Sequence, residues 1–334
     1  PILGFPVTQS LKYTGESRSY AGYSQVSYTP DILDNKLELT PGLRYTKDRK
    51  SIDQNDSTAV RSLNRSFNNL SPSFTAKYQW EKDLMTYFRF AQAYKAGGFS
   101  ARSPGDGYGP EKATSYELGV KGDYFDRHLR INADVYHTSY DGLQLNEFNA
   151  GQTVVLNAGG AHFNGGEIEI TVAPAAGWQV NGTVGYVDPV YTQFLYTDRT
   201  GVTTDIAKGA KFPFVSKTTA SFSAQYEFAP LPIGDLSLRA DYAYQGPRYF
   251  SSNPLPAVSP FQQAIKAPGW SDVGAQVMLG NIQTFGGVMQ ATLYGKNLLR
   301  QYQRIAGIDF GSLGFGEVAY GRGRVFGIDL SAKF

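Results

Sequence analysis

The sequence contains no cysteine and only three histidines, and these absences exclude several kinds of site. Without cysteine the chain has no disulfide, no thiolate metal ligand and no thiol nucleophile. His128, His137 and His162 lack the spacing of a zinc site, so each is interpreted as an ordinary polar residue of a strand or loop. We therefore expect no bound metal and no cofactor.

Long apolar runs and strong net charge are absent as well. No stretch reaches the roughly 18 apolar residues that a transmembrane helix requires. The formal net charge is +2, which gives no reason to expect a nucleic-acid partner. Residues 1–6 lack the charged and apolar regions of a signal peptide. A membrane location stays open, because a transmembrane β-barrel carries its apolar residues in alternation.

Alternation of apolar and polar residues is what the chain does contain. Phe326, Ile328 and Leu330 fall on one face of a C-terminal strand, and the polar residues between them fall on the other. The same period of two recurs at 115–124, 129–138, 218–228 and 236–245. The composition, with 14% aromatic residues and 37 glycines, is typical of a barrel with aromatic girdles.

The turn and strand signals predict about thirteen strands. They lie near 18–29, 36–48, 70–80, 84–95, 113–125, 128–147, 162–173, 178–188, 216–228, 235–249, 270–280, 288–299 and 323–334. Short connections alternate with long ones, and the long ones are predicted at 49–69, 96–112, 148–161, 189–215, 250–269 and 300–322. Transmembrane barrels have short periplasmic turns and long outer loops, whereas a soluble β-sandwich has no reason to keep this parity.

The odd number of predicted strands indicates how much of a barrel the chain contains. The last strand must run toward the periplasm if Phe334 is to end there, and counting back gives the first strand the same direction. An odd number of strands cannot close an antiparallel bacterial barrel. We therefore predict an all-β fold in which residues 1–334 form the C-terminal portion of a larger transmembrane barrel, and residues 1–17 end an outer loop.

Three stretches resemble TonB-dependent outer-membrane receptors. The first is the strand and loop 84–99, which ends in Lys95-Ala96-Gly97-Gly98-Phe99. The second, 110–121, begins with Pro110-Glu111, continues through Tyr116-Glu117 and is the most specific of the three. The third joins the Asn297-Leu298 strand, a long loop and the Gly-Arg start of the closing strand, 321–327. Their order and spacing match the family.

This resemblance implies a 22-stranded barrel plugged by an N-terminal domain, of which this chain is the later half. The plug domain and the segment that contacts an energy-coupling periplasmic protein would lie before Pro1. Phe334, as the last residue of the closing strand, resembles the end that the barrel assembly machinery reads. The implied location is integral to the bacterial outer membrane, in contact with its lipid.

The implied function is energy-coupled uptake of a bulky, scarce nutrient, most often a ferric siderophore, and not catalysis. A passive porin-like channel is the alternative, followed by an outer-membrane barrel enzyme, although no nucleophile elbow or Ser-His-Asp order is visible. The sequence does not determine the ligand, because one scaffold serves many cargoes.

Two sets of residues are candidates for contact with a ligand or with the plug. The charged residues on polar strand faces are predicted to line the lumen: Arg44, Lys77, Arg89, Glu117, Lys121, Arg130, Asp134, Glu167, Glu169, Arg239 and Asp241. The second set consists of aromatic residues and arginines in or beside outer loops: Tyr108, Phe194, Tyr196, Arg248, Tyr249, Phe250, Phe261, Tyr302, Arg304 and Phe310. Aromatic faces would stack on a planar ligand and arginines would bind its carboxylates. A hydrated, salt-bridged lining and ordinary loop packing are the alternatives.

Overall fold

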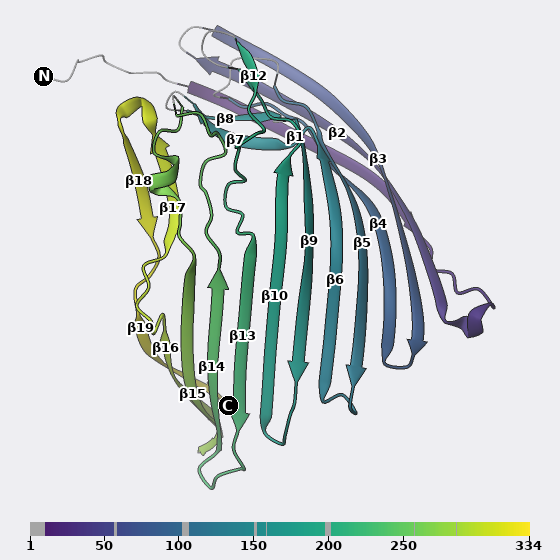
Figure 1. The fold of residues 1–334 in the computed structure, drawn as a ribbon, viewed down its shortest axis with the longest axis vertical. Helices are drawn as coiled ribbons and strands as arrows, with labels where there is room; N and C mark the ends of the chain where they lie inside the picture. The colour runs from purple at the N-terminus through teal and green to yellow at the C-terminus, as the bar shows by residue number, and fades with distance from the viewer. Residues whose placement is uncertain are drawn as a thin grey trace, which may run out of the picture.

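One antiparallel sheet of thirteen strands dominates the computed structural model (Figure 1). The structure describes residues 11–56, 59–101, 107–149, 152–157, 159–197, 202–256, 258–284 and 286–334. The strands of the sheet, in spatial order, are β1 (Leu11–Gln25), β2 (Leu37–Asp56), β3 (Ala59–Glu81), β4 (Leu84–Lys95), β5 (Glu111–Tyr124), β6 (Leu129–Asp141), β9 (Gly160–Val172), β10 (Trp178–Tyr191), β13 (Thr218–Glu227), β14 (Asp235–Gln245), β15 (Trp270–Thr284), β16 (Gly287–Lys296) and β19 (Val325–Lys333). The predicted all-β fold and the number of strands are confirmed, but β1 begins at Leu11, within the residues 1–17 that were predicted to end an outer loop.

The long connections carry small elements of their own. Three two-stranded hairpins lie in them: β7 (Gln144–Asn149) with β8 (Gln152–Asn157), β11 (Leu195–Thr197) with β12 (Thr203–Asp205), and β17 (Arg304–Phe310) with β18 (Phe315–Tyr320). The short helical turns are η1 (Leu33–Asn35), α1 (Gln262–Ile265) and η2 (Gly311–Leu313). No helix in the described part of the chain is long and apolar enough to cross a membrane.

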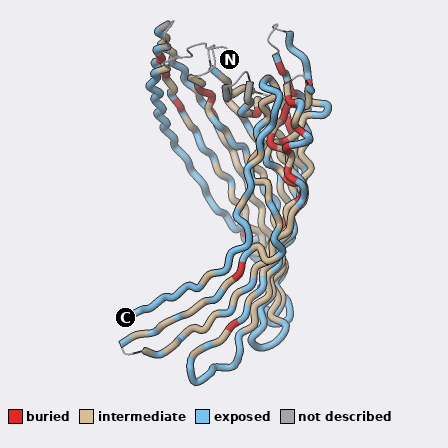
Figure 2. The backbone as a smooth tube through the Cα atoms, turned by 90° about the vertical axis from the view of Figure 1, so that its left-hand side faces the viewer, coloured by how far each residue is buried: buried red, intermediate tan, exposed pale blue. Residues whose placement is uncertain are grey.

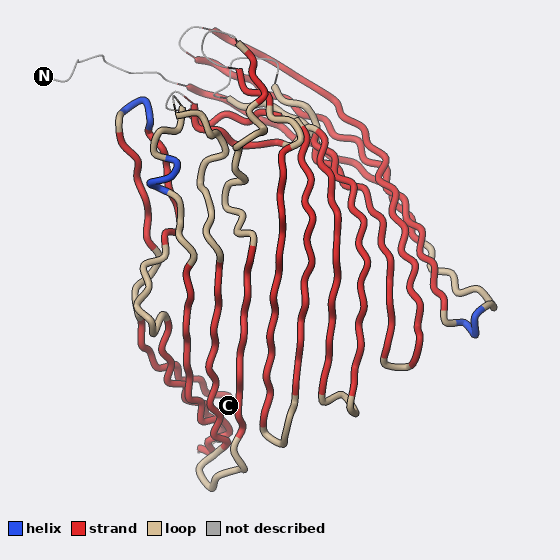
Figure 3. Tube along the Cα trace, viewed as in Figure 1, coloured by secondary structure: helices blue, strands red, loops and turns tan. Residues whose placement is uncertain are grey.

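The two ends of the sheet differ in the connections that they carry. Figure 3 shows the three hairpins gathered at one end, which we name the loop end, and short turns at the other, which we name the turn end. The C-terminus lies at the turn end (Figure 1). This arrangement has the parity of short turns and long loops that transmembrane barrels show.

The predicted long connection at 49–69 is wrong. β2 continues to Asp56 and β3 begins at Ala59, and the ladder between them runs without interruption from Leu37 opposite Tyr78 to Asp56 opposite Ala59. A search for alternating residues did not detect this continuation of β2 and β3, because it carries polar residues on both faces. Backbone hydrogen bonds hold such a hairpin together without an apolar face.

Register divides the sheet into two faces of opposite character. Residues directly opposite each other in an antiparallel pair share a face. One row runs through Tyr87, Gly119, Asp134, Glu167 and Gly185 on adjacent strands. The row beside it, on the opposite face, runs through Phe88, Leu118, Val135 and Gly166. We name these faces the polar face and the apolar face.

All the charged residues predicted to line the lumen fall on the polar face by this register. The apolar face leaves large side chains exposed, among them Leu118 and Val135 at 57% and 59% exposure. Exposed aliphatic side chains in an ordered row are typical of a lipid-facing barrel surface. The sheet is strongly curved, and its order makes β1 and β19 its two edges (Figure 2).

Most of the buried residues lie toward the loop end, as Figure 2 shows. One cluster joins two of the long connections and contains Leu143, Ala161, Tyr191, Phe194, Tyr196, Ile206 and Phe212, and Leu255 and Val258 of a third connection pack against it. Within it the rings of Tyr191 and Phe212 stack with centroids 3.8 Å apart. A second cluster contains Phe250, Ile265 and Ala267, with Phe261 and Val318 packed against it. The long connections therefore have cores of their own.

Candidate functional site

A cavity of about 850 Å³ lies on the polar face at the loop end of β1, β2 and β4. Arg44 from the predicted lumen set and Tyr108 from the predicted loop set both line it, although 64 positions separate them in the chain. The wall also contains Tyr13, Glu16, Asp48, Lys50 and Tyr94, which the sequence had not indicated, and Lys95 and Phe99 of the first family-like stretch.

Positive charge in this cavity is not neutralised by ion pairs. The Arg44 Nε donates to Thr46 Oγ1 at 3.2 Å, and its guanidinium carbon lies 5.8 Å from the centroid of the Tyr23 ring. The Lys50 ammonium donates to Ser17 Oγ. Within the described residues, neither of these cations nor Lys95 forms an ion pair. Guanidinium and ammonium groups beside tyrosine rings can hold an anion that carries a planar group.

The Gly97-Gly98 pair of the first family-like stretch shapes the wall of the cavity. Gly98 N donates to Tyr108 O at 3.1 Å, and Tyr108 N donates to Gly98 O at 2.8 Å. A Cβ on Gly97 would lie 2.3 Å from Tyr108 O and 2.7 Å from the Phe67 ring. No other residue type fits at Gly97 without displacing the backbone, because real Cβ atoms do not approach so closely.

The Pro-Glu stretch fixes the same wall from the other side. The Glu111 carboxylate accepts from Gln144 N at 2.7 Å. The Gln144 side-chain amide then donates to Ala96 O and Gly109 O, each at 3.0 Å. Asn157 accepts from Gly109 N at 2.6 Å. Nothing in the sequence indicated a role for Gln144 or Asn157. Single amide side chains are common in long connections, and only the fold brings carbonyl groups within hydrogen-bond distance of these two.

Three aromatic residues of the predicted loop set are buried in the loop cores. Phe194 is fully buried and Tyr196 lies in the same cluster, while Phe250 lies in the second cluster. Asp205 holds the Phe194 segment, since its carboxylate accepts from Phe194 N at 2.9 Å and from Ala207 N at 3.0 Å. These backbone hydrogen bonds lower the pKa of Asp205. All three rings therefore pack against other residues of this chain.

The two predicted loop arginines join neighbouring segments of the loop end. Arg248 Nη1 donates to Gln245 Oε1 at 2.6 Å, and its Nη2 donates to Arg304 O at 3.3 Å. Arg304 Nη1 donates to Ala264 O at 2.6 Å and to Lys266 O at 2.9 Å. These contacts attach the β17–β18 hairpin to the segment around α1.

The remaining members of the loop set are spread over the loop end. Two ammonium groups lie near the ring of Tyr249, with Lys211 Nζ 5.5 Å and Lys266 Nζ 5.7 Å from its centroid. Phe261 packs on the second core, and Phe310 lies 4.9 Å from Phe315 between ring centroids. Tyr302 is 81% exposed. Apart from Tyr108, no residue of this set lines the 850 Å³ cavity.

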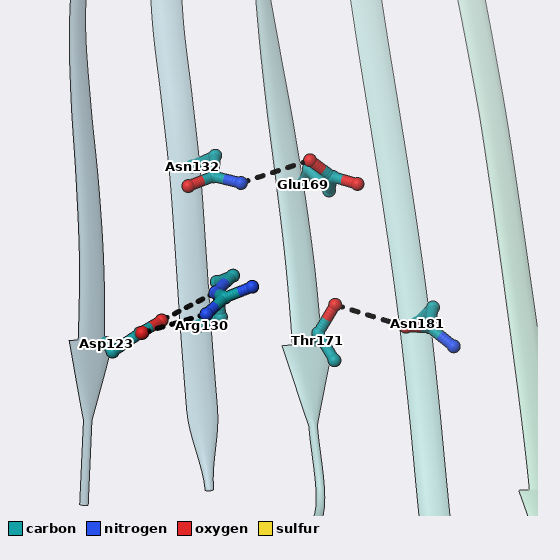
Figure 4. Close-up of polar contacts among 6 residues, drawn as sticks. All are labelled: Asp123, Arg130, Asn132, Glu169, Thr171 and Asn181. Carbon is teal, nitrogen blue, oxygen red and sulfur yellow. Dashed lines mark hydrogen bonds and ion pairs between the residues drawn. The ribbon is translucent and has the colours of Figure 1, made fainter. Parts of the chain in front are cut away.

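Toward the turn end, the polar face is a ladder of paired groups (Figure 4). Arg130 donates to both carboxylate oxygens of Asp123, at 2.6 and 2.9 Å. On the next strands, Asn132 donates to Glu169 at 3.1 Å, and Thr171 donates to Asn181 at 3.1 Å. These groups satisfy one another across adjacent strands.

Other predicted lumen residues are also paired. Arg239 and Asp241 form an ion pair at 2.7 Å, Lys77 and Glu38 form one at 3.0 Å, and Tyr87 donates to Glu117 at 2.6 Å.

The last members of the predicted sets have looser surroundings. Lys121 Nζ lies 5.8 Å from the Tyr87 ring centroid. Arg89 lies opposite Glu117, and Asp134 lies opposite Glu167. Phe334 follows β19 and is 93% exposed. In the part of the chain that the structure describes, no group of three or more metal-ligating residues occurs.

Comparison with known proteins decides the family. The family described as "TonB dependent receptor-like, beta-barrel" matches residues 3–298. This chain is a TonB-dependent receptor β-barrel. The predicted family is thereby confirmed, as is the expected location, integral to the outer membrane of a Gram-negative bacterium. Receptors and transporters of this family are not enzymes.

Individual relatives agree with this family. The pesticin receptor of Yersinia pestis is 24% identical over an alignment of 343 positions, which covers 98% of this chain and 46% of that receptor. The ferrichrome outer membrane transporter and phage receptor of Escherichia coli is 27% identical over 217 residues, which cover 64% of this chain and 27% of that protein. This chain therefore spans less than half the length of these relatives.

Solved structures share the fold. The ferric yersiniabactin uptake receptor FyuA from Yersinia pestis superposes with a TM-score of 0.76 at 21% identity, covering 99% of this chain and 48% of that one. The siderophore receptor PiuA from Acinetobacter baumannii gives a TM-score of 0.72 at 17% identity, covering 96% of this chain and 43% of that one.

Proposed function

We propose that this TonB-dependent receptor takes up a ferric siderophore by energy-coupled transport across the outer membrane. The observation that carries the proposal is the cavity at the loop end, where Arg44, Lys50 and Lys95 form no ion pair with any described residue and tyrosine rings line the wall. A ferric chelate with a net negative charge and aromatic groups fits this combination. The names of the pesticin, yersiniabactin and PiuA receptors support an iron-chelate cargo.

We further propose that residues 1–334 are the C-terminal portion of a larger barrel, and that the polar face lines its lumen. The open order of the sheet and the length of the relatives support this view. A plug domain would fill the lumen and contact an energy-coupling periplasmic protein, and the barrel assembly machinery would read Phe334. The ligand would bind between the outer loops and the plug.

Growth on a defined iron source tests the proposal. A strain lacking its own siderophore receptors is given the complete gene and a ferric siderophore as its sole iron source. We expect growth that depends on the gene and stops when the energy-coupling periplasmic protein is deleted. Growth that survives the loss of that protein would indicate a passive channel, and the absence of any iron-source dependence would overturn the siderophore assignment.

Substitution of Arg44 tests the cavity itself. We expect Arg44→Gln to weaken binding of the ferric chelate by about ten- to a hundredfold, because one charge-assisted hydrogen bond contributes about 1.5–3 kcal/mol. Arg130→Gln is the matched control, since it removes an arginine of the same face whose charge is already neutralised by Asp123. Equal binding by the two variants would show that the cavity does not hold the ligand.

A further inference from the structure

The apolar face of β2 ends abruptly in positive charge. Its five outward positions from Leu37 to Tyr45 are all apolar. They span about 27 Å along the strand at about 3.4 Å per residue, which is about 19–22 Å of height at the strand tilt of about 35–45° and covers most of the apolar band, roughly 25 Å tall, of an outer-membrane barrel. The next two positions on the same face, toward the loop end, are Lys47 and Arg49, and both are exposed.

The neighbouring edge strand adds a third cation to this border. Arg18 of β1 lies directly opposite Arg49, and Tyr20 lies directly opposite Lys47. Like charges in opposite positions of an antiparallel pair repel each other. We name Arg18, Lys47 and Arg49 the rim patch.

Carboxylates neutralise only part of the rim patch. Glu16 forms an ion pair with Arg18 at 2.6 Å. Asp53, farther along the same face of β2, accepts from Ser62 at 2.6 Å. Within the described residues, Lys47 and Arg49 form no ion pair, so the patch keeps a net positive charge.

Other strands end their apolar face differently. On β5, β6 and β9, the outward polar residues near this border include Thr114, His137 and Asn164, which carry no fixed charge. On β10 the border carries Asp188, which pairs with Lys217. Lys112 of β5 is also exposed on this face, but it lies directly opposite Asp141 of β6. Among these strands, cations with no carboxylate in an opposite position are a property of the β1–β2 border.

We propose that the rim patch binds the phosphate groups of lipid headgroups in the outer leaflet. The apolar face below it contacts the acyl chains, and long loops mark the outer side of a barrel, so the patch lies at headgroup level. Arginine forks and lysine ammonium groups bind phosphate, and their stems extend along the apolar band. Tyr20 and Tyr45, 65% and 50% exposed, lie beside the patch as interfacial anchors. A bound phosphate removes the repulsion between Arg18 and Arg49.

The test measures lipid retention by the protein purified from its complete gene. The protein is titrated with phosphatidic acid in mixed detergent micelles, and the bound lipid is counted by native mass spectrometry. We expect Lys47→Gln with Arg49→Gln to weaken retention of phosphatidic acid by about tenfold. Lys82→Gln with Arg127→Gln, which removes two exposed charges from the short turns, is the matched control and should bind as the unmodified protein does.

Three outcomes would overturn the proposal. The first is equal retention of the lipid by the rim variant and by the control. The second is retention of diacylglycerol equal to that of phosphatidic acid. The third is displacement of the lipid by inorganic phosphate at equal concentration, which would indicate a site for free anions. Lys47→Arg with Arg49→Lys keeps both charges and should restore retention. That variant separates loss of charge from loss of folding.

Discussion

The two ends of the polar face differ in whether their cations form ion pairs. At the turn end, Arg130 is bound to Asp123 and the neighbouring strands continue a ladder of side-chain hydrogen bonds. At the loop end, Arg44, Lys50 and Lys95 surround a cavity without forming an ion pair among the described residues. Both groups of cations lie on the polar face of the sheet.

This difference separates two uses of charge in one wall. A cation that already has its carboxylate has little to offer a ligand, because binding would first break that pair. A cation bound only to a hydroxyl group can accept an anionic partner at a smaller cost in free energy. We therefore propose that the turn end is the structural part of the polar face and that the loop end is the part that recognises a ligand.

Removal of a core side chain from the loops should have the largest effect, because it destabilises the loop end and leaves the rest of the barrel unchanged. We expect Phe194→Ala to destabilise the packing of the loop end by about 3–5 kcal/mol, since its ring is fully buried in an apolar cluster. Loop amides should exchange hydrogen faster and protease should cleave the loops sooner, while the heat resistance of the barrel is unchanged. Tyr302→Ala, at an exposed loop position, is the control. Unaltered loop protection in the Phe194 variant would contradict an independent loop core.

Addition of a single methyl group at Gly97 should alter the cavity wall and no other part of the loop end. We expect Gly97→Ala to displace the Gly98–Tyr108 bridge, because its Cβ would lie 2.3 Å from Tyr108 O. Overpacking of this kind costs about 1–3 kcal/mol. Ligand affinity should fall and the amides of Gly98 and Tyr108 should lose protection. Gly22→Ala on β1, where the new Cβ has no neighbour within 4 Å, should change neither quantity.

The smallest expected effect is a pH dependence of the loop end. The pKa of Asp205 is lowered by two backbone hydrogen bonds, so the folded state binds its proton less readily than the unfolded state does. Its stabilising contribution is present above the unfolded pKa, about 3.9, and is lost as pH falls through the lower folded value. Loop protection from an acid protease should therefore decline below about pH 4. Asp205→Asn should remove this decline, and a decline that persists would implicate another group.

The sequence predicted the strands well where one face is apolar. Alternation such as Phe326, Ile328 and Leu330 identified β19, and it did so wherever one face meets lipid. The same reasoning failed at 49–69, where both faces of the β2–β3 hairpin are polar and only backbone pairing reveals the strands. Periodicity detects a difference between two environments, and this hairpin has none.

The candidate site was only partly predictable. Arg44 and Tyr108 were both named from the sequence, but for different reasons, and nothing in the chain indicated that they meet. Phe194 and Phe250 satisfied the same criterion as Tyr108, namely an aromatic ring in a long connection, yet they pack into loop cores. Residue type describes what a side chain can do, and burial decides whether it is free to do it.

By itself, the sequence determined the all-β fold, the two faces of the sheet and the family, because these depend on local alternation and on short motifs. Tertiary structure alone decided which charges are paired, which aromatic residues are buried and where Arg18, Arg49 and Lys47 come together. Those properties depend on the register between strands. Register brings together side chains that are distant in the chain, and no local pattern encodes which of them will meet.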